Sequence, residues 1–342
     1  MRESDPLLER LADANPVPEG SASPGARSSA PEDLLARLLM DGSTPSVAPD
    51  PRRRPTRRAA AAGVLLASLI GGVLILRGGG NAPASAAELM LRTAALAAGR
   101  DTPTPGGPYL YSKSEADVLI TSGENTRGWS VTLPVTEETW IASDGSGRSR
   151  SSTGPPRYFG LRDQERWEAA GSPEFASGFS DEQFPAGILL YEDLRLLPTR
   201  VSALEGVLRD SVSSQHLPSD VAVFGRVGEL LARGDASPGL RAALYRVVAQ
   251  LPGVELIGDT TDPSGRPGIA VAMTYDESGA AVQVVMIFDA DTSALLAQES
   301  VLLERASWVD ASPGTRLSFV TYLEAGWTES VLAPPSSSAG RR

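Results

Sequence analysis

One segment of the chain is apolar without interruption. Residues 59–76 read AAAAGVLLASLIGGVLIL and contain no charged side chain. At the rise of an α-helix this run is about 27 Å long, close to the hydrocarbon thickness of a bilayer. The alternative is a buried core helix, but a core helix is seldom apolar on every face over its whole length. The pattern therefore predicts a single transmembrane helix.

Arginines indicate which side of this span faces the cytoplasm. Arg77 follows the span directly, whereas five membrane-flanking arginines precede it. These five are Arg52, Arg53, Arg54, Arg57 and Arg58. The positive-inside rule places the N-terminus in the cytoplasm and the chain beyond Arg77 outside, so we expect a single-pass cell-membrane protein anchored in the lipid bilayer. The alternative is cleavage by signal peptidase at the A-x-A pattern of residues 84–86.

The pattern of residues 1–58 predicts a largely disordered cytoplasmic tail with two short helices. Residues 15–31 are rich in Pro, Ser and Gly, which is typical of a linker. The second helix begins at Pro31 and carries an apolar stripe made of Leu34, Leu35, Leu38 and Leu39. We interpret this stripe as a candidate docking surface for a cytoplasmic partner, binding as a helix in a groove. The alternative is a marginal helix that lies on the membrane or stays unfolded.

Periodic patterns beyond the span predict one extracytoplasmic domain over 109–333, after a juxtamembrane linker and helix over 77–108. The helix patterns cover 84–99, 195–209, 219–234 and 237–252. The strand patterns cover 109–120, 129–142, a run from 254, 269–275, 282–288, 295–304 and 316–324. Because the late strands are joined by short turns, we expect an α+β fold with a curved, mostly antiparallel sheet. The inserted helical block would lie on its concave face, and residues 334–342 would form a disordered tail.

The composition excludes several kinds of chemistry. The chain has no Cys, a single His (His216) and 42 acidic against 31 basic residues, for a net charge of −11. Disulfides, a cysteine nucleophile and a Cys/His zinc site are therefore excluded within one chain. The acidic balance argues against direct binding of nucleic acid. Charges cancel within the tail, so the net negative charge belongs to the chain from residue 59 onward.

No residue pattern points to catalysis, a cofactor or a metal. No nucleophile motif lies near His216, and Lys113 alternates with Ser112 and Ser114 on a predicted strand, where neighbours point to opposite faces. Asp289 and Asp291 fit a β-turn better than a cation site. We therefore expect that the protein is not an enzyme. A hydrolase of cell-wall material that works through carboxylates is the alternative.

Aromatic residues supply one candidate binding surface. Seven of them fall in or near predicted strands: Trp129, Trp140, Trp167, Trp308, Trp327, Tyr109 and Tyr111. A curved sheet lined by these rings would hold an acyl chain, a lipid or an apolar peptide. The alternative is an ordinary core between sheet and helices.

Five segments resemble a known family. They are SAAELM (85–90), PYLYSKSEA (108–116), RAALYRVVAQLPGVELIGDTTD (241–262), MIFDADTSALLAQESVLL (286–303) and SFVTYLEAG (318–326). In these segments the chain is similar to a group of actinobacterial single-pass membrane proteins, over most of residues 84–328. The order of elements also resembles, remotely, the half-barrel of periplasmic lipoprotein carriers and of the regulatory partner of an envelope-stress anti-sigma factor.

The resemblance implies a role in regulation. Relatives are often encoded beside sigma factors of the extracytoplasmic-function type, which implies an anti-sigma or sensor role with a sigma factor as the partner of the tail. The tail has no Cys and no His, so it lacks the zinc cluster of zinc-binding anti-sigma domains. We therefore expect a membrane-anchored sensor or regulator, coupled through one transmembrane helix to a cytoplasmic partner. The alternative is a membrane-tethered binder of a lipid or apolar envelope ligand that does not signal.

Overall fold

The computed structural model of the protein describes residues 85–100, 106–122, 128–175, 177–189, 192–215, 217–332 and 334. The expected span at 59–76, the arginines at 52–58, the leucines at 34–39 and His216 lie outside these residues. None of the helices that the structure describes is long and apolar enough to cross a membrane. The membrane topology, the cytoplasmic tail and the docking surface on that tail therefore stay predictions.

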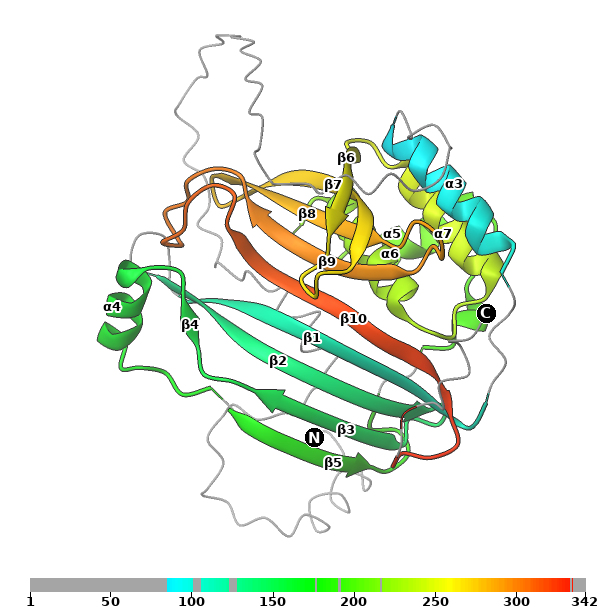
Figure 1. The fold of residues 1–342 in the computed structure, drawn as a ribbon, viewed down its shortest axis with the longest axis horizontal. Helices are drawn as coiled ribbons and strands as arrows, with labels where there is room; N and C mark the ends of the chain where they lie inside the picture. Colours follow the sequence, from blue (N-terminus) through cyan, green and yellow to red (C-terminus); the bar gives the residue numbers. More distant parts are fainter. Residues whose placement is uncertain are drawn as a thin grey trace, which may run out of the picture.

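The described residues form one sheet of ten strands, in which every pairing is antiparallel (Figure 1). The first strands are β1 (Tyr109–Ser122), β2 (Trp129–Ala142), β3 (Gly147–Thr153), β4 (Arg157–Tyr158) and β5 (Gly178–Phe184). The later ones are β6 (Glu255–Thr261), β7 (Pro267–Glu277), β8 (Ala280–Phe288), β9 (Leu295–Leu302) and β10 (Arg316–Thr328). The order across the sheet is β5-β3-β2-β1-β10-β9-β8-β7-β6, with β4 paired to β2.

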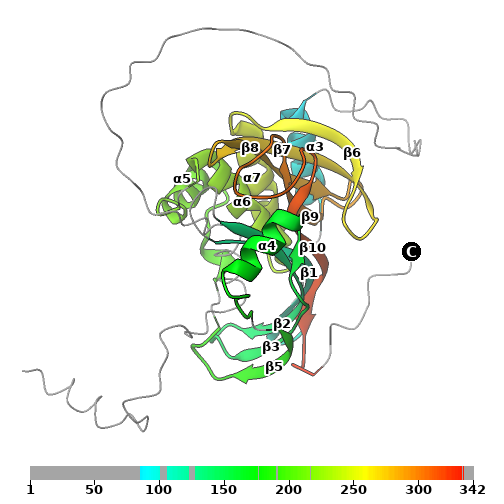
Figure 2. The ribbon, with the colours of Figure 1, turned by 90° about the vertical axis from the view of Figure 1, so that its left-hand side faces the viewer.

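Short turns join β6, β7, β8 and β9, and a longer loop over 303–315 joins β9 to β10. Strands β6 to β10 follow one another as a meander, which confirms the antiparallel arrangement expected for them. Strand β1 pairs with β2 on one side and with β10 on the other, so the first and last strands of the sheet meet in its middle. A β-bulge interrupts the β1–β10 pairing between Lys113 and Ser114. Bulges bend strands, and Figure 2 shows that the sheet is curved.

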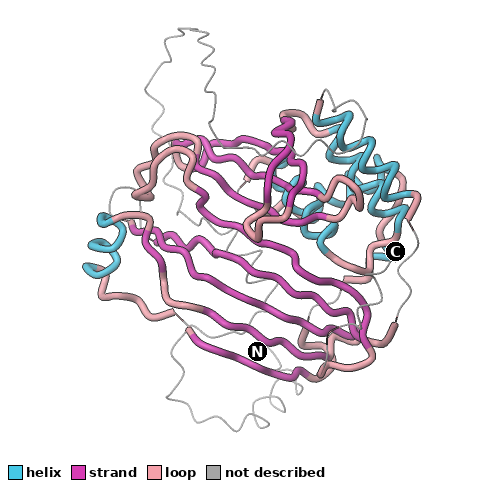
Figure 3. Tube along the Cα trace, in the orientation of Figure 1, coloured by secondary structure: helices cyan, strands magenta, loops and turns pink. Residues whose placement is uncertain are grey.

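The helices gather on one face and near one end of the sheet, except for α4 (Figure 3). They are α3 (Ala86–Ala98), α4 (Leu161–Ala169), α5 (Val201–Ser211), α6 (Ser219–Ala232) and α7 (Pro238–Gln250), with a short 3₁₀ turn at Leu194–Leu196. The block α5–α7 is inserted between β5 and β6, as expected. It buries the largest core cluster, whose bulkiest members are Phe224, Tyr245 and Phe288.

For the helix predicted over 195–209, the predicted first residue was wrong. The structure has a 3₁₀ turn at 194–196, and α5 begins only at Val201. Pro198 explains the break, because proline has no backbone N–H and disfavours helical geometry at the residue before it. The helix expected over 84–99 is confirmed as α3, where Ser85 Oγ accepts a hydrogen bond from Glu88 N at 3.1 Å.

Helix α4 is held by a buried carboxylate. Asp163 is fully buried and accepts hydrogen bonds from Ser130 N at 3.2 Å and Asp310 N at 2.7 Å. Asp310 in turn accepts from Arg162 N at 3.1 Å, which caps the first turn of α4 from the loop before β10. Burial raises the pKa of Asp163. These bonds tie α4 to β2 and to the loop between β9 and β10.

Candidate functional site

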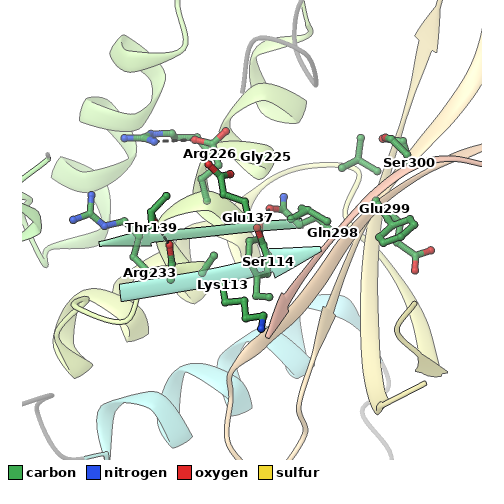
Figure 4. Close-up of a pocket in the computed structure, with 18 of the residues that line it drawn as sticks. Lys113, Ser114, Glu137, Thr139, Gly225, Arg226, Arg233, Gln298, Glu299 and Ser300 are labelled. Atoms are coloured by element: carbon green, nitrogen blue, oxygen red, sulfur yellow. Dashed lines mark hydrogen bonds and ion pairs between the residues drawn. The ribbon is translucent and has the colours of Figure 1, made fainter. Parts of the chain in front are cut away.

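A cavity of about 440 Å³ lies between α6 and the middle of the sheet (Figure 4). Side chains of β1, β2, β9 and β10 form its floor, α6 forms the opposite wall, and Tyr275 and Val284 close one side. This volume falls within the range of roughly 300–1,000 Å³ that is usual for small-molecule sites. The cavity is therefore the candidate functional site.

The floor of the cavity is polar because of the strand register. Ser112 pairs with Thr139 across β1 and β2, and Ser114 pairs with Glu137, so these four residues share one face. The hydroxyls of Ser112 and Thr139 lie 2.6 Å apart in a hydrogen bond. Figure 4 shows Glu137 pointing from the sheet toward α6. The floor therefore offers hydroxyls and one carboxylate.

Two glycines of α6 set the distance between the helix and the sheet. A Cβ at Gly228 would lie 2.3 Å from Gln298 Nε2, so the helix touches the sheet there. Gln298 is itself fixed, because Tyr322 donates a hydrogen bond of 2.7 Å to its Oε1. Gly225, one turn earlier, lines the cavity instead. The cavity therefore lies next to Gly225, a position of α6 that has no side chain.

Charged side chains also line the cavity. Arg226 donates to Glu229 Oε2 at 2.8 Å and also to Glu192. Arg233 donates to the backbone carbonyl of Glu192 at 2.8 Å and to Asp235 Oδ2 at 2.7 Å. Burial would lower the pKa of Arg226, but the Glu229 and Glu192 carboxylates outweigh it and raise that pKa. Both guanidinium groups are thus bound to acceptors of the protein.

The aromatic rings that the sequence offered as one candidate binding surface mostly lie away from the cavity. Of the seven candidate rings, only Tyr111 lines the cavity among the described residues. The ring of Tyr111 lies 5.1 Å from that of Trp140, and its hydroxyl donates to Glu138 Oε1 at 3.0 Å. Arg148 and Arg150 both lie over the Trp140 ring. Burial and the Glu138 hydrogen bond raise the pKa of Tyr111, whose hydroxyl therefore stays protonated as a donor to Glu138.

The other sequence candidates have structural roles. Lys113 lies 3.5 Å from Glu138 Oε1 in an ion pair, and Figure 4 shows it pointing away from the cavity. Asp289 accepts hydrogen bonds from the backbone N–H groups of Asp291 and Thr292, as an Asp in a turn does. In the part of the chain that the structure describes, no group of three or more acidic or histidine side chains is placed to hold a metal ion.

The residues that matter most for the cavity were not singled out from the sequence. Glu137, Gly225 and Gly228 are not among the candidate residues named from the sequence. A signal was present, because glycines three residues apart inside a helix lower its stability and indicate a packing reason. The partner of that packing, Gln298, lies far away in sequence.

Comparisons with known proteins add little. No protein-family model matches the chain, and no curated protein is significantly similar to it. Among solved structures, the chain is similar to a chain in the MucA/MucB complex of Pseudomonas aeruginosa, with 15% identity and a TM-score of 0.22. The match covers 70% of this chain and 56% of that chain, so it spans just over half of the neighbour. A TM-score this low does not establish a shared fold.

Proposed function

We propose that the protein is a membrane-anchored sensor whose extracytoplasmic domain binds an apolar or amphipathic small molecule between α6 and the sheet. The observation that carries this proposal is the cavity of about 440 Å³. Its walls include the apolar side chains of Leu217, Val221 and Val284, while its floor carries hydroxyls and a carboxylate. Such a mixture of apolar walls and few polar groups is typical of ligand sites.

The packing of the helices supports a route from the cavity toward the membrane. Helix α6, which forms one wall, contacts α7, and α7 packs against α3. Helix α3 starts at Ala86, shortly after the predicted span at 59–76, and buries Leu89, Met90 and Ala94. A ligand that shifts α6 would therefore act on the element that leads into the membrane. The tail would pass the signal to a cytoplasmic partner, for which a sigma factor is the candidate.

Protection of a single thiol tests the binding step. The chain has no Cys, so Ser114→Cys introduces one reactive thiol on the cavity floor. The full chain is placed in nanodiscs and alkylated with a maleimide, with and without single-chain alcohols, fatty acids or amines. We expect at least one of these compounds to slow alkylation several-fold. The control is Ser202→Cys on the exposed face of α5, where no ligand should protect. Equal rates with and without every compound would refute the proposal.

The coupling to the cytoplasm has a separate test. A pull-down with residues 1–58 is expected to recover a sigma factor, and replacing Leu35 and Leu38 by Asp should abolish recovery. If no sigma factor is recovered under several envelope stresses, the sensor would be reduced to a tethered binder. Deleting residues 1–50 separates these two roles, because a binder without signalling would leave transcription unchanged.

A further inference from the structure

One carboxylate, that of Glu137, can give the cavity floor a negative charge. Figure 4 labels seven residues of the sheet that line the cavity: Lys113, Ser114, Glu137, Thr139, Gln298, Glu299 and Ser300. Three of these are charged: Lys113 pairs with Glu138, Glu299 pairs with Arg316, and Glu137 points toward α6. It is 9% exposed, so its carboxylate sits in a site with little access to water. A buried carboxylate is costly unless donors or a positive charge surround it.

The two arginines that line the cavity form ion pairs with other carboxylates. Arg226 binds Glu192 and Glu229, and Arg233 binds Asp235. The lining as a whole holds more acids than bases: Glu137, Glu192, Glu229, Glu299 and Glu324 against Lys113, Arg226 and Arg233. An anionic head group would have to displace existing ion pairs and approach Glu137. A cationic head group binds at Glu137 without displacing these ion pairs.

The floor is also rich in acceptors for N–H groups. A carboxylate offers roughly four lone-pair positions, so its two oxygens can accept hydrogen bonds from more than one donor. Hydrogen bonds between an ammonium group and a carboxylate are charge-assisted and stronger than neutral ones. The hydroxyls of Ser114 and Thr139 lie on the same face and provide additional acceptors.

We propose that the cavity selects amphipathic molecules with a cationic, N–H-donating head group, which binds at Glu137 while the apolar chain lies along α6. This inference rests on the proposed function and specifies the chemistry of its ligand.

The test uses three amphiphiles that share one chain: dodecylammonium, dodecanoate and dodecanol. Each is titrated against maleimide alkylation of Ser114→Cys in the full chain, in nanodiscs of zwitterionic lipid. We expect dodecylammonium to protect at a concentration at least about tenfold lower than the other two, the effect of one added charge-assisted contact. Equal protection by dodecanoate would overturn the inference.

A second variant locates the preference. Glu137→Gln in the Ser114→Cys background should abolish the advantage of dodecylammonium and leave protection by dodecanol within about twofold. Glu115→Gln is the matched control, because it removes the same charge from the exposed face of β1. A preference that survives in Glu137→Gln would overturn the assignment to Glu137. If that variant does not fold, the three ligands on the parent chain still decide the question.

The outcomes also separate this inference from the proposed function. If all three amphiphiles protect equally, the cavity binds ligands but the head-group preference is refuted. If none protects, both proposals fail.

Discussion

Filling the cavity by substitution should stabilise the protein while removing its binding site. Gly225 lines the cavity from α6, so we expect a leucine side chain at this position to occupy part of the cavity. Gly206, in the exposed middle of α5, has no atom within 4 Å of a built Cβ and serves as the matched control. The two substitutions share the same change in helix propensity and differ only in what surrounds the new side chain.

The expected magnitudes follow from two contributions. Replacing Gly by Leu inside a helix lowers the free energy of the folded state by about 0.8 kcal/mol. Complete burial of a leucine side chain adds roughly 1.5–3 kcal/mol. Gly225 is only partly buried, so we take the lower part of that range and expect Gly225→Leu to gain about 2 kcal/mol. Gly206→Leu should gain only the propensity term, about 0.8 kcal/mol.

Urea denaturation followed by tryptophan fluorescence measures both free energies of unfolding. In addition, Gly225→Leu should make the Ser114→Cys thiol slow to alkylate without any ligand, whereas Gly206→Leu should not. A Gly225→Leu variant less stable than Gly206→Leu would refute the reasoning. It would mean that α6 packs tightly on the sheet at this point, since overpacking costs about 1–3 kcal/mol.

Three further predictions concern stability. Asp163→Ala should lower the free energy of unfolding by about 2 kcal/mol or more, because it leaves two backbone N–H donors without their acceptor; an unchanged denaturation midpoint would contradict this. Burial raises the pKa of Glu299 above its ordinary 4.5, so the stability that this carboxyl contributes is present below its unfolded pKa and is lost as the pH rises through the folded pKa. Glu299→Gln does not ionise, and its stability relative to the parent should therefore increase in thermal melts as the pH rises above about 4.5; a constant difference would argue against a raised pKa. Ser85→Ala removes the N-cap of α3 and should cost about 1 kcal/mol, seen as faster amide exchange in α3 but not in α7.

Much of the fold was predictable because the periodic segments are long. Strands β7 and β8 and helices α6 and α7 carry apolar residues at the spacing of their element, and the structure has them where the pattern indicates. Strands β3 and β5 were missed because GRSRSST contains no apolar residue and GFSDEQF has few. They form through pairing and cross-strand contacts instead, such as Arg148 Nε to Asp181 Oδ1 at 2.6 Å.

The site was less predictable than the fold, and the reason is physical. Helix α4 is polar and takes its cap from Asp310, which lies far along the sequence. The cavity depends in the same way on Gly225 and Gly228 of α6 facing residues of the sheet that come before and after them in the chain. A sequence pattern describes each face alone, so it offered the large aromatic rings as one candidate surface, and most of them pack elsewhere.

A crystal structure of the protein soaked with dodecylammonium would show whether the cavity binds a cationic amphiphile. We expect density for the alkyl chain between α6 and the strands β1 and β10, with the ammonium group within hydrogen-bond distance of Glu137. An empty cavity at saturating ligand, or density for the ligand only on another surface, would contradict this expectation.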